Sequence, residues 1–309
     1  MFIKNFLNKI LNKKKLLIIY RFGSSLGDQL CLTAVIKNLN KDFNYKIILF
    51  VSYPQFFLNN PNIYKIFYFR NLFIIKILNK FFKILKSDYF LEYRAIENSD
   101  NNKYFISKKK GQHLANAHAS HFEFYDTKAN SDLSCEFFFS DQEIILLKKK
   151  YNFKKKFALV QSESKVSFTP NKNWFPERFN EVIKNINFID WIQIGPKNDY
   201  KIEGTIDMRS ELNIRELAYI VSKSEFILCL EGFLNHLASC FQKKTFIITS
   251  GFIPSSVISY KNSYFIKSKK KPFCDPCYLL TKCPIDNYPC MNNISSIDVI
   301  DFIRTNLKD

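Results

Sequence analysis

The sequence predicts an α/β protein with two domains, each built around a parallel sheet. Short apolar runs alternate with longer stretches of helical period, which is the pattern of βαβ units. The alternation restarts after a Lys-rich segment near residue 150, and 309 residues accommodate two domains of about 150 residues each. We therefore predict domains at 1–150 and 151–309, with a ligand cleft between them.

The first domain is predicted to contain strands at 16–20 and 46–52, with a helix at about 28–39 between them. The apolar, β-branched and aromatic residues of 46–52 suit a strand that is buried on both faces. A polar, Lys-rich loop is expected at 96–113, well after this strand. These elements describe the start of a parallel α/β sheet.

Residues 66–86 have the pattern of a basic amphipathic helix, with Lys76, Lys80 and Lys83 at helical spacing among apolar residues. Such a helix can lie on an anionic membrane surface. It can equally pack its apolar face on a core and leave its lysines in water, which is the interpretation that the periodicity favours.

The second domain follows a helix and charged linker at 141–155. Its strands and helices are predicted to alternate to the end of the chain, and the last strand closes the sheet. The strands are 157–162, 191–195, 226–230 and 245–250, and the helices are 176–186, 214–224, a stretch after Gly232, and 294–307. The segment 294–307 has a clear helical period, and we expect this last helix to pack back across the interdomain face.

Composition indicates a globular protein with a strongly basic surface. The hydrophobic fraction of 47% suffices for a core, and the net charge of +18 attracts nucleic acid, anionic lipid or phosphorylated substrates. A solvated lysine-rich surface explains the charge equally well. The sequence has no zinc finger, RNA-recognition signature or isolated basic arm, so nucleic-acid binding is not expected.

The N-terminal segment is basic and partly apolar but unlike a signal peptide. Lys13–Lys15 interrupt its apolar stretch, and no small-residue cleavage site follows. No segment reaches the run of about 18 uncharged apolar residues that spans a bilayer. We therefore expect a cytoplasmic protein whose eight cysteines are reduced thiols or metal ligands.

The first motif is RFGSSLGDQL at 21–30, directly after the first predicted strand. A small-residue loop turns the chain tightly and presents backbone N–H groups at the start of a helix. Asp28 is then either a helix cap, which spacing alone favours, or a catalytic carboxylate near the cleft. The pattern is neither GxGxxG nor a P-loop, so a dehydrogenase or NTPase gains no support. The loop residues are Gly23, Ser24, Ser25 and Gly27.

RFGSSLGDQLCLTAVIKNL resembles the opening of glycosyltransferase family 9, the ADP-heptose:lipopolysaccharide heptosyltransferases. Members begin with an apolar strand, a small-residue loop, Gly-Asp, and a helix that carries Thr a few residues on. Gly27, Asp28 and Thr33 fall on that pattern. The resemblance implies the GT-B fold of two Rossmann-like domains, and it implies that Asp28 is the general base.

Two short motifs resemble the family's donor site. NKNWFPERF at 171–179 is similar to the family's Lys-x-Trp-Pro-x-Glu-x-Phe, which implies that Lys172 meets the donor diphosphate. QIGPKND at 193–199 resembles a strand-Gly-x-x-x-acid turn, which implies that Asp199 binds ribose hydroxyls. Without the family, Lys172 is one of many surface lysines and Asp199 a solvated turn acid.

LEGFLNHLA at 230–238 resembles the family's Asp-Ser/Thr-Gly-x-x-His-Leu-Ala, which faces the diphosphate at a helix start. Glu231 replaces Asp, Gly232 comes one position early, and His236 keeps its place. A related branch of the family carries Glu-Gly-Gly at this turn. The resemblance implies that these three residues bind the donor. The two differences from the family motif, at 231 and 232, put the identity of the donor sugar in question more than the fold.

Four cysteines lie within 17 residues in the segment 274–290. Its KCPIDNYPCM part resembles the C-terminal signature of the heptosyltransferases. The added CDPC pair allows a four-thiolate structural zinc or iron site, while free thiols remain the alternative for a cytosolic protein. The candidate ligands are Cys274, Cys277, Cys283 and Cys290.

The resemblance as a whole implies an inverting glycosyltransferase that needs no metal for catalysis. It would move a heptose or related sugar from an ADP-heptose-like donor, bound by the C-terminal domain, to a lipopolysaccharide core or other cell-surface glycan. The acceptor would be an anionic glycolipid bound by the N-terminal domain, with peripheral contact to the inner membrane. The Glu-Gly-Phe turn at 231–233 differs from the family motif at the donor site. The alternative function is therefore a non-catalytic binding or scaffold protein derived from the GT-B fold.

Overall fold

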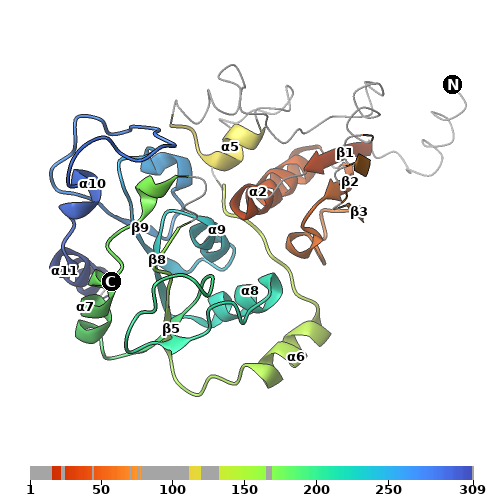
Figure 1. The fold of residues 1–309 in the computed structure, drawn as a ribbon. Coiled ribbons are helices and arrows are strands. Elements are labelled where there is room, and N and C mark those ends of the chain that lie inside the picture. The colour runs from red at the N-terminus through yellow and green to blue at the C-terminus, as the bar shows by residue number, and fades with distance from the viewer. Residues whose placement is uncertain are drawn as a thin grey trace, which may run out of the picture. The chain divides into compact units, whose positions relative to one another are not determined.

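The computed structural model describes residues 16–21, 25–43, 45–69, 71, 73–74, 77, 111–119, 132–164 and 169–307. It divides into two compact units, Met1–Ser140 and Asp141–Asp309 (Figure 1). The division falls ten residues before the boundary expected at 150, so the helix α6 (Asp141–Lys150) groups with the second unit.

Ion pairs explain why α6 belongs there. The carboxylate of Glu143 in α6 accepts hydrogen bonds from Nε and Nη2 of Arg215, at 2.5 and 2.6 Å. The Lys150 Nζ lies 2.5 Å from Glu216 Oε1. Both partners are in the first turn of α8 (Ile214–Lys223). The helix expected at the start of the segment 141–155 is therefore confirmed, and it is fixed to the second unit.

The first unit contains a three-stranded parallel sheet in the order β1-β2-β3. The elements are β1 (Leu16–Arg21), α2 (Leu26–Phe43), β2 (Lys46–Val51), a 3-10 turn η1 (Pro54–Phe56), β3 (Lys65–Tyr68) and α5 (Leu114–Ala119). The strands at 16–20 and 46–52 and the helix between them are confirmed. Burial alternates along β2, so only one of its faces is fully covered by described residues, against the expectation of two.

The start of the predicted helix 66–86 is a strand. Residues 65–68 pair with β2, and Phe67 stacks on Phe50 with ring centroids 4.9 Å apart. Cross-strand aromatic pairing of this kind outweighs a helical pattern of apolar residues. Residues 73–74 and 77 are helical, whereas Lys76, Lys80 and Lys83 lie outside the described residues, as does most of the expected loop 96–113.

The second unit contains a six-stranded sheet, parallel throughout, in the order β6-β5-β4-β7-β8-β9. Its strands are β4 (Phe157–Val160), β5 (Asp190–Gln193), β6 (Ile206–Asp207), β7 (Phe226–Leu230), β8 (Lys244–Ile248) and β9 (Ser263–Ile266). The expectation that 245–250 closes the sheet was wrong, because β9 continues it. The order reverses at β4, the place where open α/β sheets bind ligands.

Helices cover both faces of this sheet: α7 (Arg178–Asn185) and α11 (Ser296–Leu307) on one, α8 and α9 (Phe233–Ser239) on the other (Figure 1). Edge-to-face rings of Trp191, Phe226 and Phe246 fill the space under α7 and α11, with centroids 5.3 and 5.7 Å apart. The C-terminal helix, expected to cross the interdomain face, packs on α7 within this unit. Among the described residues, every helix is too short or too polar to cross a membrane.

Candidate functional site

Lys172 is held at the carboxyl edge of the six-stranded sheet by a short turn, η2 (Pro170–Lys172). Thr169 caps this turn, and its hydroxyl donates to the Leu279 carbonyl at 2.9 Å. The buried Asn171 amide donates to the carbonyls of Leu279 and Thr281, at 2.8 and 2.7 Å. Two polar residues that the motif comparison passed over therefore fasten the turn to the Cys-rich segment.

Lys172 and Glu231 form a buried ion pair. The Lys172 Nζ lies 2.5 Å from Glu231 Oε1, with side-chain exposures of 13% and 3%, and 4.9 Å from the centroid of the Phe252 ring. Glu231 directly follows the buried strand β7. Its Oε2 is buried and has no hydrogen-bond partner among the described residues. Two residues expected to bind the donor are thus brought together.

Gly232 is the residue that caps α9 at its start, and His236 lies within this helix. Gly232 precedes α9 with φ at 173°, extended backbone that any residue adopts, and a Cβ there would meet no atom within 4 Å. His236 is buried, and its Nδ1 lies 2.7 Å from the Tyr260 hydroxyl. The imidazole therefore anchors the loop before β9, while the space beside Gly232 stays open.

Asp199 is buried beyond β5 with an unpaired oxygen. The residue is 8% exposed, and its Oδ2 has no hydrogen-bond partner in the described part of the chain. Burial, and then the charge of Glu163, raise the pKa of Asp199 to about 6, against the opposing charge of Arg209. Gly195 has φ at +131°, and a Cβ there would lie 2.5 Å from Asp199 Oδ2. Glycine is therefore required at 195 for its backbone and for the carboxylate.

Glu163 is a candidate site residue that the sequence analysis missed. It follows the fully buried strand β4 at the reversal of strand order, and its Oε1 accepts from the Tyr200 amide at 2.7 Å. The carboxylates of Glu163 and Asp199 thus come from neighbouring strand ends. An acidic residue three positions after a fully apolar strand was the available signal.

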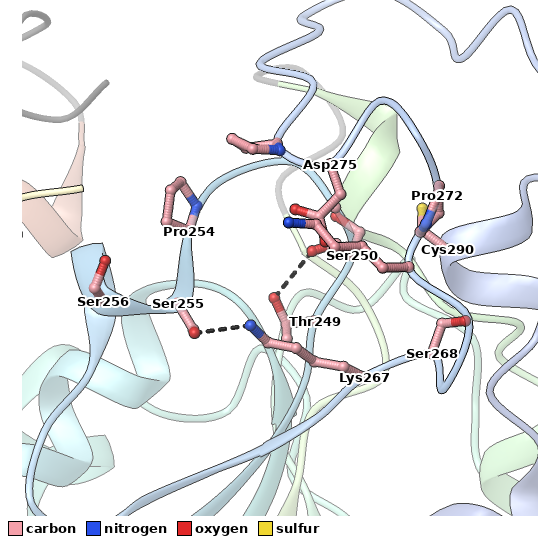
Figure 2. Close-up of a pocket in the computed structure, with 13 residues that line it drawn as sticks. Thr249, Ser250, Pro254, Ser255, Ser256, Lys267, Ser268, Pro272, Asp275 and Cys290 are labelled. Atoms are coloured by element: carbon pink, nitrogen blue, oxygen red, sulfur yellow. Dashed lines mark hydrogen bonds between the residues drawn. The ribbon is translucent and has the colours of Figure 1, made fainter. Parts of the chain in front are cut away.

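A cavity of about 380 Å³ lies beside this edge of the sheet, between the loops that follow β8 and β9 and the Cys-rich segment. Figure 2 shows Lys267 reaching to Ser255, to which its Nζ donates at 2.8 Å. Gly251 allows the Cys-rich segment to come close to the loop after β8, since a Cβ at 251 would lie 3.1 Å from the Asp275 Cβ. Hydroxyls, two lysines and a carboxylate are among the groups that line this cavity, together with three prolines.

The Cys-rich segment adds a strand-like contact to the loop after β8. The amides of Cys277 and Tyr278 donate to the carbonyls of Gly251 and Phe252, at 2.8 and 3.0 Å. All eight cysteines are free thiols. Burial, and then the nearby thiols of the segment, raise the pKa of Cys277 and Cys290. The four thiols are neighbours, but no three His, Cys, Asp or Glu side chains of the described residues are arranged to hold a metal ion.

Asp28 lies in the first turn of α2 in the first unit. The helix begins at Leu26, so Asp28 is its third residue rather than its cap. Its Oδ1 lies 3.3 Å from Nε2 of the fully buried His118 on α5. Of the loop residues, Ser25 is exposed and Gly27 lies in the first helical turn, whereas Gly23 and Ser24 lie outside the described residues.

Thr33, which matches the family pattern, joins α2 to the segment that follows. Its hydroxyl donates to the Leu30 carbonyl at 2.7 Å and accepts from the Glu136 amide at 2.8 Å. The residue is fully buried. Its place in the motif is thus explained by packing and backbone hydrogen bonding.

Each single replacement in the Lys172–Glu231 pair is expected to destabilise the protein. The double replacement should destabilise it less than the sum of the two single effects. Glu231→Gln leaves the ammonium beside a neutral amide, and Lys172→Met leaves a buried carboxylate uncompensated. Urea unfolding of both single variants and the double variant should give a coupling free energy of about 1–3 kcal/mol. The exposed Lys156–Glu225 pair, 3.4 Å apart, is the control and should give less than about 1 kcal/mol. Additive effects at 172 and 231 would contradict a stabilising pair.

Asp199→Asn is expected to raise thermal stability at pH 8 and to have little effect at pH 4. The pKa of Asp199 is about 6 in the folded protein and about 4 in an unfolded chain. Its contribution to stability is therefore largest below about pH 4 and is lost as the pH rises through about 6. After allowance for solvent screening, the gain at pH 8 should be about 2–4 °C in Tm by calorimetry.

Asp207→Asn is the matched control with the opposite sign. Arg209 donates to both Asp207 oxygens, at 2.8 and 2.9 Å, and these hydrogen bonds lower the pKa of Asp207. Its ionised form stabilises the fold at pH 8, so the variant should lose stability there. Equal changes in Tm for Asp199→Asn and Asp207→Asn at pH 8 would contradict the raised pKa of Asp199.

Comparison with known proteins gives the fold. No protein-family model and no curated protein matches the chain by sequence. A glycosyltransferase family 9 structure from Veillonella parvula is 14% identical, covers 95% of this chain and 97% of its own, and has a TM-score of 0.69. The iron-containing dodecameric heptosyltransferase TibC, in complex with ADP-D-β-D-heptose, is 12% identical over 96% and 76%, with a TM-score of 0.68.

A third similar structure is ADP-heptose lipopolysaccharide heptosyltransferase II of E. coli, 11% identical over 95% of this chain and 98% of its own, with a TM-score of 0.65. At such identities the likeness concerns the arrangement of helices and strands. The chain has the fold of the glycosyltransferase family 9 heptosyltransferases, the family that its sequence motifs resemble.

Proposed function

We propose that this chain is a glycosyltransferase that moves a heptose or related sugar from a nucleoside diphosphate to a cell-surface glycan. The observation that carries the proposal is the buried Lys172–Glu231 pair at the strand reversal of a parallel sheet. Buried charge is costly, and its placement where α/β sheets bind ligands favours a binding role. The heptosyltransferase fold supplies the reaction class.

Lys172 is the proposed contact of the donor diphosphate. Glu231 and the Phe252 ring hold its ammonium in place, while 13% of the side chain stays exposed to a ligand. An ammonium has three donors, so it can serve the carboxylate and a phosphate oxygen together. Its charge would then stabilise the leaving diphosphate. Gly232 and His236 complete the proposed donor set, Gly232 by leaving open space and His236 by fixing the neighbouring loop.

Asp199 is the proposed contact of the ribose. Its buried Oδ2 has no hydrogen-bond partner among the described residues, and a sugar hydroxyl is a donor that would satisfy it. Glu163 lies close enough to influence the titration of Asp199, which supports it as a second acceptor for the same hydroxyls. Two carboxylates at neighbouring strand ends suit a vicinal diol.

Asp28 is the proposed general base of an inverting displacement. The acceptor oxygen forms a bond to the anomeric carbon as the bond from that carbon to the phosphate oxygen breaks, and the electron pair leaves with the diphosphate. The acceptor proton passes to the Asp28 carboxylate, which is partly exposed and can be reached. No metal ion takes part in these steps.

The acceptor is proposed to be an anionic glycolipid such as a lipopolysaccharide core, bound by the first unit. The net charge of +18 supports an anionic acceptor and peripheral contact with the cytoplasmic face of the inner membrane. The predicted membrane helix rested on Lys76, Lys80 and Lys83, which lie outside the described residues. The net charge alone therefore supports this part of the proposal.

A non-catalytic binding or scaffold protein is the second candidate. One observation favours it: Glu231 already neutralises Lys172, the cation that a diphosphate would need. A protein that kept the fold and lost the reaction could retain such an internal pair. Binding of nucleotides separates the two candidates.

The first experiment is thermal-shift and calorimetric binding of ADP, UDP, GDP and CMP with their matched sugar conjugates. We expect one diphosphate to stabilise the protein specifically, because ligands that bind only the folded state raise its stability. Lys172→Ala should weaken binding about 10- to 100-fold, the value of a charged hydrogen bond. Lys156→Ala, an exposed lysine just before β4, should bind as the wild type does. A folded protein that binds no member of the panel would support the scaffold candidate.

We also propose a structural zinc or iron ion at the four cysteines of the segment 274–290. The neighbouring thiols and the added CDPC pair support it, although as described the thiols do not converge, so a metal would draw the segment together. The ion has no part in the reaction. Elemental analysis of purified protein should find about one equivalent per chain, reduced in a Cys274→Ser/Cys283→Ser variant and kept in Cys240→Ser. Equal metal content in all three proteins would refute the site.

A further inference from the structure

We infer that the cavity between the loops after β8 and β9 and the Cys-rich segment binds the phosphate group of a phosphorylated sugar. The inference goes beyond the proposed function, because none of the residues proposed to bind the donor is among the 13 residues that line this cavity. Two lysines, one carboxylate and five hydroxyl groups line the same hollow. Its volume of about 380 Å³ lies within the range of small-molecule sites, about 300–1,000 Å³.

Lys267 is the cation that the fold holds at the cavity. It directly follows β9, and because β8 and β9 are parallel, the loop after β8 emerges at the same edge of the sheet. Ser255 belongs to that loop, and Figure 2 shows the two side chains pointing toward each other, with Nζ donating to the hydroxyl at 2.8 Å. An ammonium has three donor protons, of which the described residues accept one. The other two are left for a ligand.

Two serine hydroxyls add further donors. The Ser250 hydroxyl accepts from the Phe252 amide at 3.2 Å, and the Ser255 hydroxyl accepts from Lys267. Each hydroxyl also carries one proton, which within the described part of the chain is given to no acceptor. A phosphate group offers three strong acceptor oxygens, and its hydrogen bonds to an ammonium are charge-assisted. The donors of this cavity therefore complement a phosphate group.

Lys271 brings a second positive charge to the cavity. The nearby Lys269 lies 2.6 Å from Asp298 Oδ1 and does not line the cavity. Lys271 does line it and forms no ion pair with any described residue. Two lysines stand against the single carboxylate of Asp275, so the lining has a net charge of two minus one, or +1. A hollow of net positive charge attracts anions.

Asp275 favours a sugar phosphate over phosphate alone. Its side chain packs against Gly251, where a Cβ would lie 3.1 Å from the Asp275 Cβ and 3.3 Å from its Cγ. A carboxylate repels a phosphate group but accepts hydrogen bonds from sugar hydroxyls. A ligand that carries both groups satisfies the lysines and the carboxylate together. Such a phosphate belongs either to a free sugar phosphate or to a phosphorylated glycan.

The test is calorimetric binding of glucose 6-phosphate, with inorganic phosphate and glucose as the two partial probes. We expect glucose 6-phosphate to bind more tightly than either. Lys267→Gln should weaken its binding about 10-fold, the value of one charged hydrogen bond. Lys270→Gln is the matched control, because Lys270 is an exposed lysine of the same loop that does not line the cavity. It should change the dissociation constant less than about two-fold, as expected of a surface charge.

Asp275→Asn should change the two phosphate ligands in opposite directions. Inorganic phosphate should bind more tightly, because a negative charge has been removed, whereas the advantage of glucose 6-phosphate over inorganic phosphate should fall. Thermal unfolding of each variant without ligand checks that the fold is kept. An unchanged ratio of the two dissociation constants would contradict the role of the carboxylate in binding the sugar.

Competition with ADP separates this site from the proposed donor site. ADP should not displace glucose 6-phosphate, and Lys172→Ala should bind the sugar phosphate as the wild type does. Displacement by ADP would overturn the inference, as would equal binding by Lys267→Gln and Lys270→Gln or no binding by the wild type. Binding of glucose 6-phosphate by a protein that binds no nucleotide would refute the proposed function and support this site.

A last arm identifies the source of the phosphate. Deacylated lipopolysaccharide core competes with glucose 6-phosphate before and after treatment with phosphatase. Displacement by the phosphorylated core alone supports a site for a phosphorylated glycan, and displacement by neither form supports a site for a free sugar phosphate. Equal displacement by both forms would show that the phosphate is not what the cavity recognises, and would overturn the inference.

Discussion

The reversal of strand order at β4 is the constraint on which the second unit depends. All six strands run in one direction, so every loop after a strand emerges at the same edge of the sheet. At β4 one neighbour is β5 and the other is β7, and the connections leave towards opposite sides. The central strands β4, β7 and β8 are buried and largely apolar, so polar groups gather just beyond their ends. Lys172, Glu231 and Asp199 all belong to that edge.

Charge at this edge is compensated unevenly, which supports the ligand side proposed above. Glu231 has Lys172 as its partner, and Asp207 has Arg209. Asp199 faces a second carboxylate instead, and burial first, then the charge of Glu163, raise its pKa to about 6. A fold optimised for stability alone would pair this group or replace it with an amide. Perturbed carboxylates in such positions are more often retained for binding, although structural networks also perturb titration.

The sequence predicted the buried elements well and the edges poorly, for a physical reason. Strands such as β7 are apolar along their whole length, so the pattern is unambiguous. The two edge strands carry weaker signals: β6 has two residues, and three of the four residues of β9 are only half-buried. Motifs likewise placed Lys172 and Glu231 on separate loops, but their contact depends on how the strands are ordered. Glu163 stands outside any motif, because its neighbours Asp199 and Tyr200 are distant in the sequence.

The substitution of Glu for Asp at 231 is better explained as preorganisation than as loss of the donor site. One additional methylene lets the carboxylate reach Lys172, and the Phe252 ring faces the same ammonium. A damaged site would be expected to lose its lysine or to bury it completely. Here the ammonium keeps a fixed place, and 13% of its side chain stays exposed. A lysine held in this way would lose little side-chain entropy on binding the proposed diphosphate, so the pair is compatible with the proposed binding role and need not be broken by it.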